Sequence, residues 1–168
     1  RARTEQMNAW DEELMEKSSI LLKNEILPLS ADAKIYVTSN SEDIAERDVA
    51  AISAKATVVD TMEETDVIVA HMTALGDSWD YVIEDAQAAG KPIVLVLQGG
   101  FNRGGKAPIE PTERDALACA AIIMETYDSL PDHGTALPDF YRYTYPSITA
   151  DFLFGARVPQ GSTVYEIG

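Results

Sequence analysis

The chain has few of the residues that hold metals or form covalent cross-links. Its 168 residues include one cysteine, Cys119, and two histidines, His71 and His133. A single cysteine cannot form an intrachain disulfide, and this small set leaves a zinc or haem site of the usual kind short of ligands. We therefore expect no metal and no tightly bound cofactor, and the cysteine usage suits a reducing, cytoplasmic compartment.

Positive charge is also scarce. Lys and Arg together number 13 against 28 Asp plus Glu, which gives a formal net charge of −15 and an isoelectric point near 4.3. Because this charge repels phosphate backbones and anionic lipid, we expect neither nucleic acid nor a membrane surface as a partner. No apolar run approaches the roughly 20 residues of a membrane-spanning helix. The first residue is Arg1, and no secretory signal pattern follows it.

Length and composition predict a single domain, residues 1–168. With 46% hydrophobic and 24% charged residues, the chain can bury a core. We expect an N-terminal helix within residues 1–30 and an α/β core over 33–128. An irregular C-terminal arm over 129–168 follows, with a possible hairpin between 148–157 and 162–167.

The N-terminal helix is predicted to begin at a cap on Thr4 and to run to about Glu25. Pro28 follows shortly afterwards and cannot continue a helix. One stripe of this helix is apolar and contains Met7, Trp10, Leu14 and Leu21. A stripe that includes a tryptophan must be buried against the sheet or against a second copy, so we expect a homo-oligomer.

The core shows strands and helices in alternation. Short apolar runs predict strands at 34–38, 56–59, 66–70 and 91–97, with helices at 42–53, at 79–89 and from Thr112 to about 127. Gly90 is the residue type that ends helices in the left-handed conformation. The alternation predicts the α/β class: a small doubly wound, Rossmann-like or flavodoxin-like parallel sheet of four or five strands, with helices on both faces.

Candidate binding residues follow the predicted strands. In doubly wound sheets, ligands bind beyond the carboxyl ends of the strands. The residues there are rich in hydroxyls and poor in cations, which suits a sugar or a base better than a triphosphate; they are Thr38, Ser39, Asn40, His71, Ser78, Gly99 and Gly100. The alternative is that they only cap helices and form turns. For His71 the alternatives are a proton shuttle and a half-buried structural histidine.

Several short motifs together resemble a known family. They are Ile35-Tyr36 in the first core strand, the apolar strand at 66–70, Asp77-Ser78 opening a helix, and Gly90-Lys91-Pro92 ending it. This set, within residues 33–98, resembles the nucleoside 2-deoxyribosyltransferase superfamily. TIR-like domains share a similar plan, and Ser78-Trp79 resembles their helix entry.

The resemblance implies that the protein binds a nucleoside or nucleotide and cleaves or transfers its N-glycosidic bond. Glu84 would then be the nucleophile that stabilises an oxocarbenium-like state, as in glycoside hydrolysis. Asp77 would hold a sugar hydroxyl or act as an acid, and Tyr36 would position the carboxylate. An enzyme of this kind would be a deoxyribosyltransferase or an N-glycosidase.

The helix itself allows a second interpretation of the same scaffold. Glu84 points away from the predicted buried stripe, which contains Trp79, Val82, Ile83, Ala86 and Ala89, so it can equally be a solvated surface carboxylate. Val82 stands nine residues before Lys91, where the family places its glutamate. The alternative function is therefore a non-catalytic ligand-binding or assembly protein, and whether the chain is an enzyme stays open.

The segment after the last predicted core strand is rich in glycine. Residues 100–106 fit the pattern G-x-x-x-x-G-K, but Ala107 replaces the magnesium-binding hydroxyl, and Pro108 prevents a helix from starting there. We expect a binding loop or lid over 99–111 instead of a phosphate loop. Cys119 lies in an apolar run and is expected to be an inert core thiol.

Overall fold

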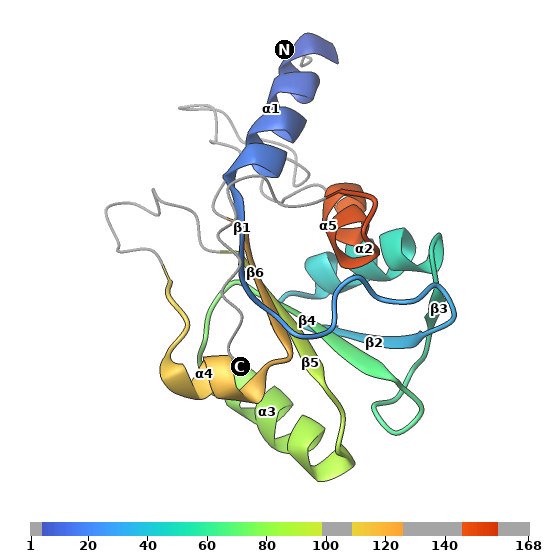
Figure 1. The fold of residues 1–168 in the computed structure, drawn as a ribbon, viewed down its shortest axis with the longest axis vertical. Helices are drawn as coiled ribbons and strands as arrows, with labels where there is room; N and C mark the ends of the chain where they lie inside the picture. The colour runs from blue at the N-terminus through green and yellow to red at the C-terminus, as the bar shows by residue number, and fades with distance from the viewer. Residues whose placement is uncertain (1–4, 99–108, 126–145, 158–168) are drawn as a thin grey trace.

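The computed structural model describes residues 5–98, 109–125 and 146–157, and the bounds of every element within them are as follows (Figure 1). The strands are β1 (Ser19–Asn24), β2 (Lys34–Ser39), β3 (Thr57–Val58), β4 (Val67–Met72), β5 (Ile93–Gln98) and β6 (Ala121–Glu125). The helices are α1 (Glu5–Ser18), α2 (Glu42–Ser53), α3 (Asp77–Ala89), α4 (Glu113–Ala118) and α5 (Pro146–Leu153).

The described strands form one sheet in the order β1-β6-β5-β4-β2-β3. Strands β2 to β6 are parallel, and β1 pairs with β6 in the antiparallel direction. Taken in chain order, the five parallel strands follow the 2-1-3-4-5 arrangement of flavodoxin-like folds. The predicted α/β class, with a doubly wound parallel sheet of Rossmann-like type, is confirmed.

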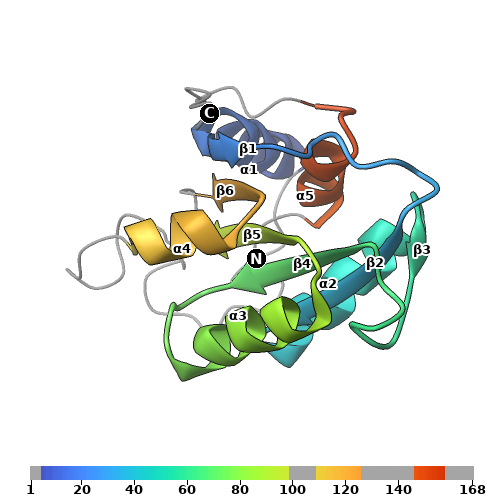
Figure 2. The same cartoon turned by 60° about the horizontal axis from the view of Figure 1, so that its bottom comes forward.

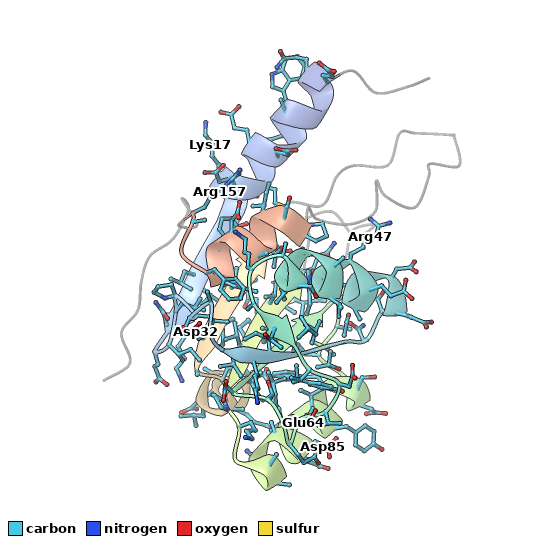
Figure 3. All side chains as sticks on the ribbon, turned by 90° about the vertical axis from the view of Figure 1, so that its right-hand side faces the viewer. Lys17, Asp32, Arg47, Glu64, Asp85 and Arg157 are labelled. Atoms are coloured by element: carbon cyan, nitrogen blue, oxygen red, sulfur yellow. The ribbon has the colours of Figure 1, made fainter. Side chains whose placement is uncertain are left out.

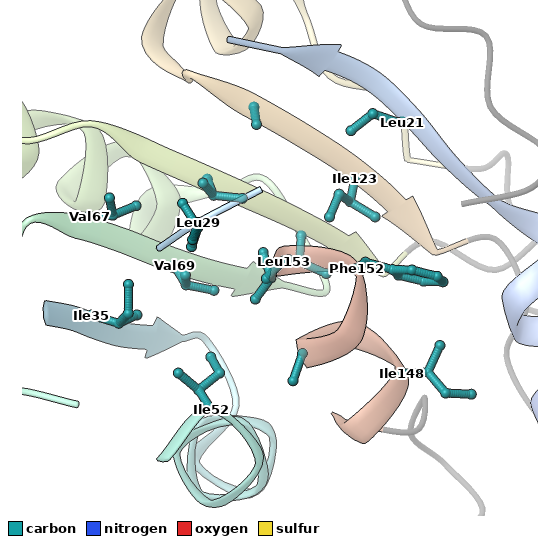
Figure 4. Close-up of a cluster of buried hydrophobic side chains, with 14 of the residues drawn as sticks. Leu21, Leu29, Ile35, Ile52, Val67, Val69, Ile123, Ile148, Phe152 and Leu153 are labelled. Carbon is teal, nitrogen blue, oxygen red and sulfur yellow. The ribbon is translucent and has the colours of Figure 1, made fainter. Parts of the chain in front are cut away.

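Helices cover both faces of the sheet because the chain builds outward from β2 in two directions. Figure 2 shows α3 and α4 along one face and α5 on the other. Two hydrophobic cores result. The first packs alternate strand residues against α2 and α5; Figure 4 shows Val69 and Ile123 facing Phe152 and Leu153. The second packs the remaining strand residues against α3 and α4 and includes Trp79.

The unit from β4 to β5 agrees with the sequence pattern. Every residue of both strands is buried, as expected for strands covered on both faces. Gly90 ends α3 with φ of +66°, and its N–H donates to the carbonyls of Ala86 and Gln87. The helix begins at Asp77, two residues earlier than predicted, with Gly76 as its N-cap.

The N-terminal prediction is wrong in its second half. The helix ends at Ser18, and residues 19–24 form β1 instead of continuing the helix, because they pair with β6. The predicted stripe is divided accordingly. Leu21 is buried in the sheet, whereas Trp10 and Leu14 on α1 are 56% and 48% exposed. Figure 1 shows α1 extending beyond the body of the sheet.

The helix predicted from Thr112 is also shorter than expected. Thr112 and Asp115 form a reciprocal capping box at its start, but the helix ends at Ala118, and residues 121–125 form β6. Cys119 follows the helix and is buried, as predicted. Burial and the negative charge of Asp115 outweigh the positive charge of Lys23 and raise the pKa of the Cys119 thiol to about 12.

The predicted C-terminal strand at 148–157 is wrong. Residues 148–153 of this segment belong to α5, which begins at Pro146, where the missing N–H is tolerated in the first turn. The helix is held in place by an ion pair of 2.8 Å between Lys55 and Asp151, and by a hydrogen bond from Leu29 N–H to the Leu153 carbonyl. The partner strand predicted at 162–167 lies outside the described residues.

The two outer strands of the sheet differ from the inner ones. The register of β1 against β6 shifts between Leu21 and Lys23. The Lys23 side chain points inward and donates to the carbonyls of Ala116 and Cys119, at 2.8 and 2.6 Å. Strand β3 has two residues only. Among the helices that the structure describes, none has the length and apolar character that crossing a bilayer requires.

Candidate functional site

A cavity of about 550 Å³ lies where strand β4 leads into α3. One wall comes from the β4–α3 connection and the first turn of α3, and the other from the segment that enters α4. The lining residues are Ala74, Leu75, Gly76, Trp79, Asp80, Ile109, Glu110, Thr112, Arg114 and Asp115. The position is the carboxyl end of a doubly wound sheet, where such folds bind their ligands.

A buried hydrogen bond holds the two walls of the cavity together. The indole Nε1–H of Trp79 donates to Oδ1 of Asp115 at 2.8 Å, and the Trp79 side chain is almost fully buried. The other carboxylate oxygen accepts from the Thr112 backbone N–H at 2.7 Å and from its hydroxyl at 2.9 Å. Burial alone would raise the pKa of Asp115. These hydrogen bonds and the charge of Arg114 outweigh that effect and lower it. Asp115 is therefore an anion fixed in the wall.

The rim of the cavity carries an ion pair. Arg114 Nη1 donates to Asp80 Oδ1 at 2.7 Å, and both side chains are about half exposed. Beside this pair, Leu75 and Ile109 are partly buried and pack against the second core. The arrangement offers an apolar surface next to a hydrogen-bond acceptor and a donor, which can hold a flat ring and a hydroxyl-bearing group together.

The predicted residues at the end of β2 and just after it stabilise the loops at the carboxyl end of the sheet. Asn40 Nδ2–H donates to the Thr73 hydroxyl at 2.8 Å, and the Thr73 backbone N–H donates to Asn40 Oδ1 at 2.9 Å. These two bonds join the ends of β2 and β4, where the direction of sheet building reverses. The Ser39 hydroxyl accepts from the Ser41 N–H at 3.1 Å. Asn40 and Ser39 thus take part in turn structure.

The three predicted catalytic residues are not brought together at the cavity. Glu84 is exposed on α3 and is not among the lining residues; its neighbour Asp85 lies at the outer surface in Figure 3. Asp77 is the exposed first residue of α3. Tyr36 is partly buried against the second core, on the same face of the sheet as the cavity.

Of the remaining predicted binding residues, two are described on this side of the molecule. Thr38 is partly buried in β2, two residues beyond Tyr36 and hence on the same face of the sheet. Ser78 is exposed in the first turn of α3 and does not line the cavity. Gly99 and Gly100 lie outside the described residues.

His71 belongs to a second polar cluster, on the face of the sheet opposite the cavity. Its Nδ1 lies 2.6 Å from Asp48 Oδ2 of α2, and its Nε2 lies 3.4 Å from Glu125 Oε2 at the end of β6. The Thr149 hydroxyl of α5 donates to the other oxygen of Glu125 at 2.5 Å. All four side chains are buried. The cluster therefore ties two strands to both helices of this face.

The charge of His71 depends on its two carboxylate neighbours. Burial alone would lower the pKa of His71, but the charges of Asp48 and Glu125 and the hydrogen bond with Asp48 raise it to about 10. The imidazolium therefore persists at neutral pH. Only 1% of the residue is exposed, so His71 is more deeply buried than the half-buried residue we expected. Nearby at the end of β5, Gln98 is 6% exposed, and its Oε1 accepts no hydrogen bond from the described part of the chain.

Sequence reasoning missed the partners of His71, although each carried a signal. Asp48 lies between Ile44 and Ile52 at intervals of four residues, so it shares the buried face of α2. Glu125 ends a strand whose other residues are all apolar. A charged residue on a buried face requires a partner of opposite charge. For these carboxylates, the partner is a lysine, an arginine or one of the two histidines in the chain. The cavity residues Asp80 and Arg114 carried no comparable pattern.

Comparison with known proteins assigns no role to these residues. No protein-family model matches the chain, and no curated protein matches it. The chemistry available to the cavity and to the His71 cluster follows from their geometry.

Proposed function

We propose that the protein binds a nucleoside in the cavity between α3 and α4. One observation carries this proposal: the cavity at the carboxyl end of the sheet combines an apolar wall with a polar pair on its rim. A base can lie against Leu75 and Ile109, and the attached sugar can reach Asp80 and Arg114. The volume of about 550 Å³ is within the usual range for small-molecule sites, roughly 300–1,000 Å³.

A second candidate function is cleavage or transfer of the N-glycosidic bond of the bound nucleoside. The resemblance of residues 33–98 and the position of Tyr36 on the cavity face of the sheet support it, although Tyr36 pairs with Ile68 near the start of β4 and so lies away from the carboxyl end of the sheet. The exposed position of Glu84, outside the cavity lining, favours binding without turnover. Binding is therefore the function that the geometry supports best.

Titration calorimetry with a panel of nucleosides tests the binding proposal. A Gly76→Phe variant should block the site, since Gly76 lines the cavity and a Cβ added there meets no atom within 4 Å. Asp85→Asn is the matched control, because Asp85 is exposed on the same helix and does not line the cavity. We expect saturable binding that Gly76→Phe abolishes and Asp85→Asn retains. Equal binding by all three proteins would place the ligand elsewhere and reject the proposal.

The same mixtures, analysed by chromatography, test the second candidate. Free base, or a new nucleoside when an acceptor base is added, would establish glycosidic chemistry. Glu84→Gln should then abolish product formation while the protein stays folded. Product formed at an unchanged rate by this variant would exclude Glu84 as the nucleophile.

A further inference from the structure

The charges around the cavity are unequal in number. Among the residues that the structure describes, three carboxylates line it, those of Asp80, Glu110 and Asp115, against one guanidinium, that of Arg114. Arg114 is already paired with Asp80, so its charge is partly neutralised before any ligand arrives. A phosphate group entering the cavity would meet a net negative wall on a chain whose formal charge is −15.

The Asp80–Arg114 pair retains unused hydrogen-bonding capacity. One oxygen of Asp80 accepts from Arg114, and the other accepts nothing from the residues that the structure describes. Arg114 has five N–H groups, of which one is engaged by Asp80. A hydroxyl both donates and accepts, so two adjacent hydroxyls can donate to the carboxylate and accept from the guanidinium at the same time.

The pair is held in place by the buried bond next to it. Trp79 and Asp80 are consecutive on α3, and Arg114 and Asp115 are consecutive on α4. Because Trp79 and Asp115 are joined inside the protein, their neighbours are brought together on the rim at 2.7 Å. Pre-organisation of this kind reduces the entropy lost when a ligand is bound.

We infer that the Asp80–Arg114 pair recognises the vicinal hydroxyls of an unphosphorylated sugar, so that the cavity selects a free ribonucleoside over its 2′-deoxy and 5′-phosphate forms. This inference rests on the proposed nucleoside binding and adds the class of ligand to it. Asp80 accepts hydrogen bonds from the sugar hydroxyls, Arg114 donates hydrogen bonds to them, and the surrounding carboxylates repel phosphate.

Calorimetric titration of three ligands that share one base tests the inference: a ribonucleoside, its 2′-deoxy form and its 5′-monophosphate. Losing a hydrogen bond to a charged group should weaken the 2′-deoxy form about tenfold or more. The monophosphate should bind at least as weakly as the 2′-deoxy form. Added salt should reduce the difference in affinity between the monophosphate and the ribonucleoside, because screening weakens the repulsion of the phosphate. In Asp80→Asn and in Asp80→Ala, the dissociation constants of the ribonucleoside and its 2′-deoxy form should differ by no more than about threefold. The control Glu113→Gln, exposed on α4 outside the cavity, should keep the full preference.

The outcomes separate this inference from the proposed function. If nucleosides bind and Gly76→Phe blocks them, but the phosphate or the 2′-deoxy form binds as tightly as the ribonucleoside, the inference is wrong and the proposed function stands. The inference also fails if both Asp80 variants, with unchanged thermal unfolding, retain the preference. If no form binds, the proposed function is rejected and the inference is rejected with it.

Discussion

His71 Nδ1 and Asp48 Oδ2 lie 2.6 Å apart in the interior, although 23 residues separate them in the chain. The contact joins the middle of α2 to the carboxyl end of β4, and Glu125 of β6 lies on the other side of the imidazole. An imidazolium between two carboxylates makes the stability of this face of the sheet dependent on pH.

The first prediction concerns the direction of that dependence. The folded-state pKa of His71, about 10, is above its ordinary value of 6.5, so the folded protein holds this proton more tightly than the unfolded chain does. The stabilisation is complete below about pH 6.5 and is lost as the pH rises through about 10. We expect the urea midpoint of the wild type to fall over this pH range, and the urea midpoint of His71→Gln to fall less steeply. Parallel curves for the two proteins would contradict the prediction.

The second prediction concerns removal of one partner. Asp48→Ala leaves His71 with Glu125 alone and creates a void between α2 and β4. Removing one member of a buried ion pair typically destabilises a protein by about 3–5 kcal/mol. Urea unfolding at pH 7 measures the loss, with Glu46→Ala on the exposed side of α2 as the control. A loss as small as that of the control would show that the Asp48–His71 contact contributes little.

The third prediction concerns the bond between Trp79 and Asp115. Asp115→Ala removes the half of the capping box in which the Asp115 carboxylate accepts from the Thr112 backbone N–H, and it leaves the buried indole N–H unpaired, which should cost roughly 2–4 kcal/mol in total. Because the pKa of Asp115 is lowered in the folded state, its contribution is present above about pH 4 and is lost as the pH falls through the lowered value. Unfolding at pH 7 and in acid, compared with the exposed Glu113→Ala, checks both statements. If Asp115→Ala lost as much stability in acid as the wild type does, the predicted pH dependence of the Asp115 contribution would be contradicted.

The fourth prediction compares two glycines that border α3. Gly90 has φ of +66°, so Gly90→Ala forces an L-residue into the left-handed region at about 1–2 kcal/mol. Gly76 has φ of −116° and open space at its Cβ position, so Gly76→Ala loses only the N-cap preference for Gly over Ala and should cost about 0.5 kcal/mol, less than Gly90→Ala. Thermal unfolding of the two variants distinguishes the positions, and equal shifts would contradict the backbone explanation.

Elements with a complete local signal could be predicted from the sequence. Strands β4 and β5 are continuous apolar runs, and Gly90 marks the end of the helix between them, so the whole unit could be recognised without any distant contact. The fold class follows from this unit and the alternation around it.

The segments predicted wrongly as helix, residues 19–24 and 121–125, are partners of each other. Ser19 pairs with Glu125 and Asn24 with Ala121 in the antiparallel ladder. Each is a short apolar run beside a true helix, and periodicity alone cannot separate a buried strand from a helical segment of this length. The signal that makes each a strand lies about one hundred residues away, which no local pattern contains.

The candidate site, too, could be predicted only in part, because its contacts depend on distant residues. The sequence predicts polar residues such as Asn40 and His71 near strand ends, but which of them meet depends on the face of the sheet that each one occupies. His71 faces α2 and Asp48, whereas Tyr36 faces α3. The rim pair of Asp80 and Arg114 needs α3 and α4 to pack side by side, and the bond that ensures this, from Trp79 to Asp115, spans 36 residues.

The outer strands of the described sheet have a consequence for how molecules of this protein meet in solution. An exposed strand edge ordinarily invites a strand from another molecule, and repeated pairing of that kind leads to aggregation. Here β1 carries an irregular register and an inward-pointing Lys23 that is bound to the carbonyls of Ala116 and Cys119. At the opposite edge, β3 has two residues, too short to template a partner. Together with the mutual repulsion of chains that each carry a charge of −15, these features protect the sheet from edge-to-edge growth at high concentration.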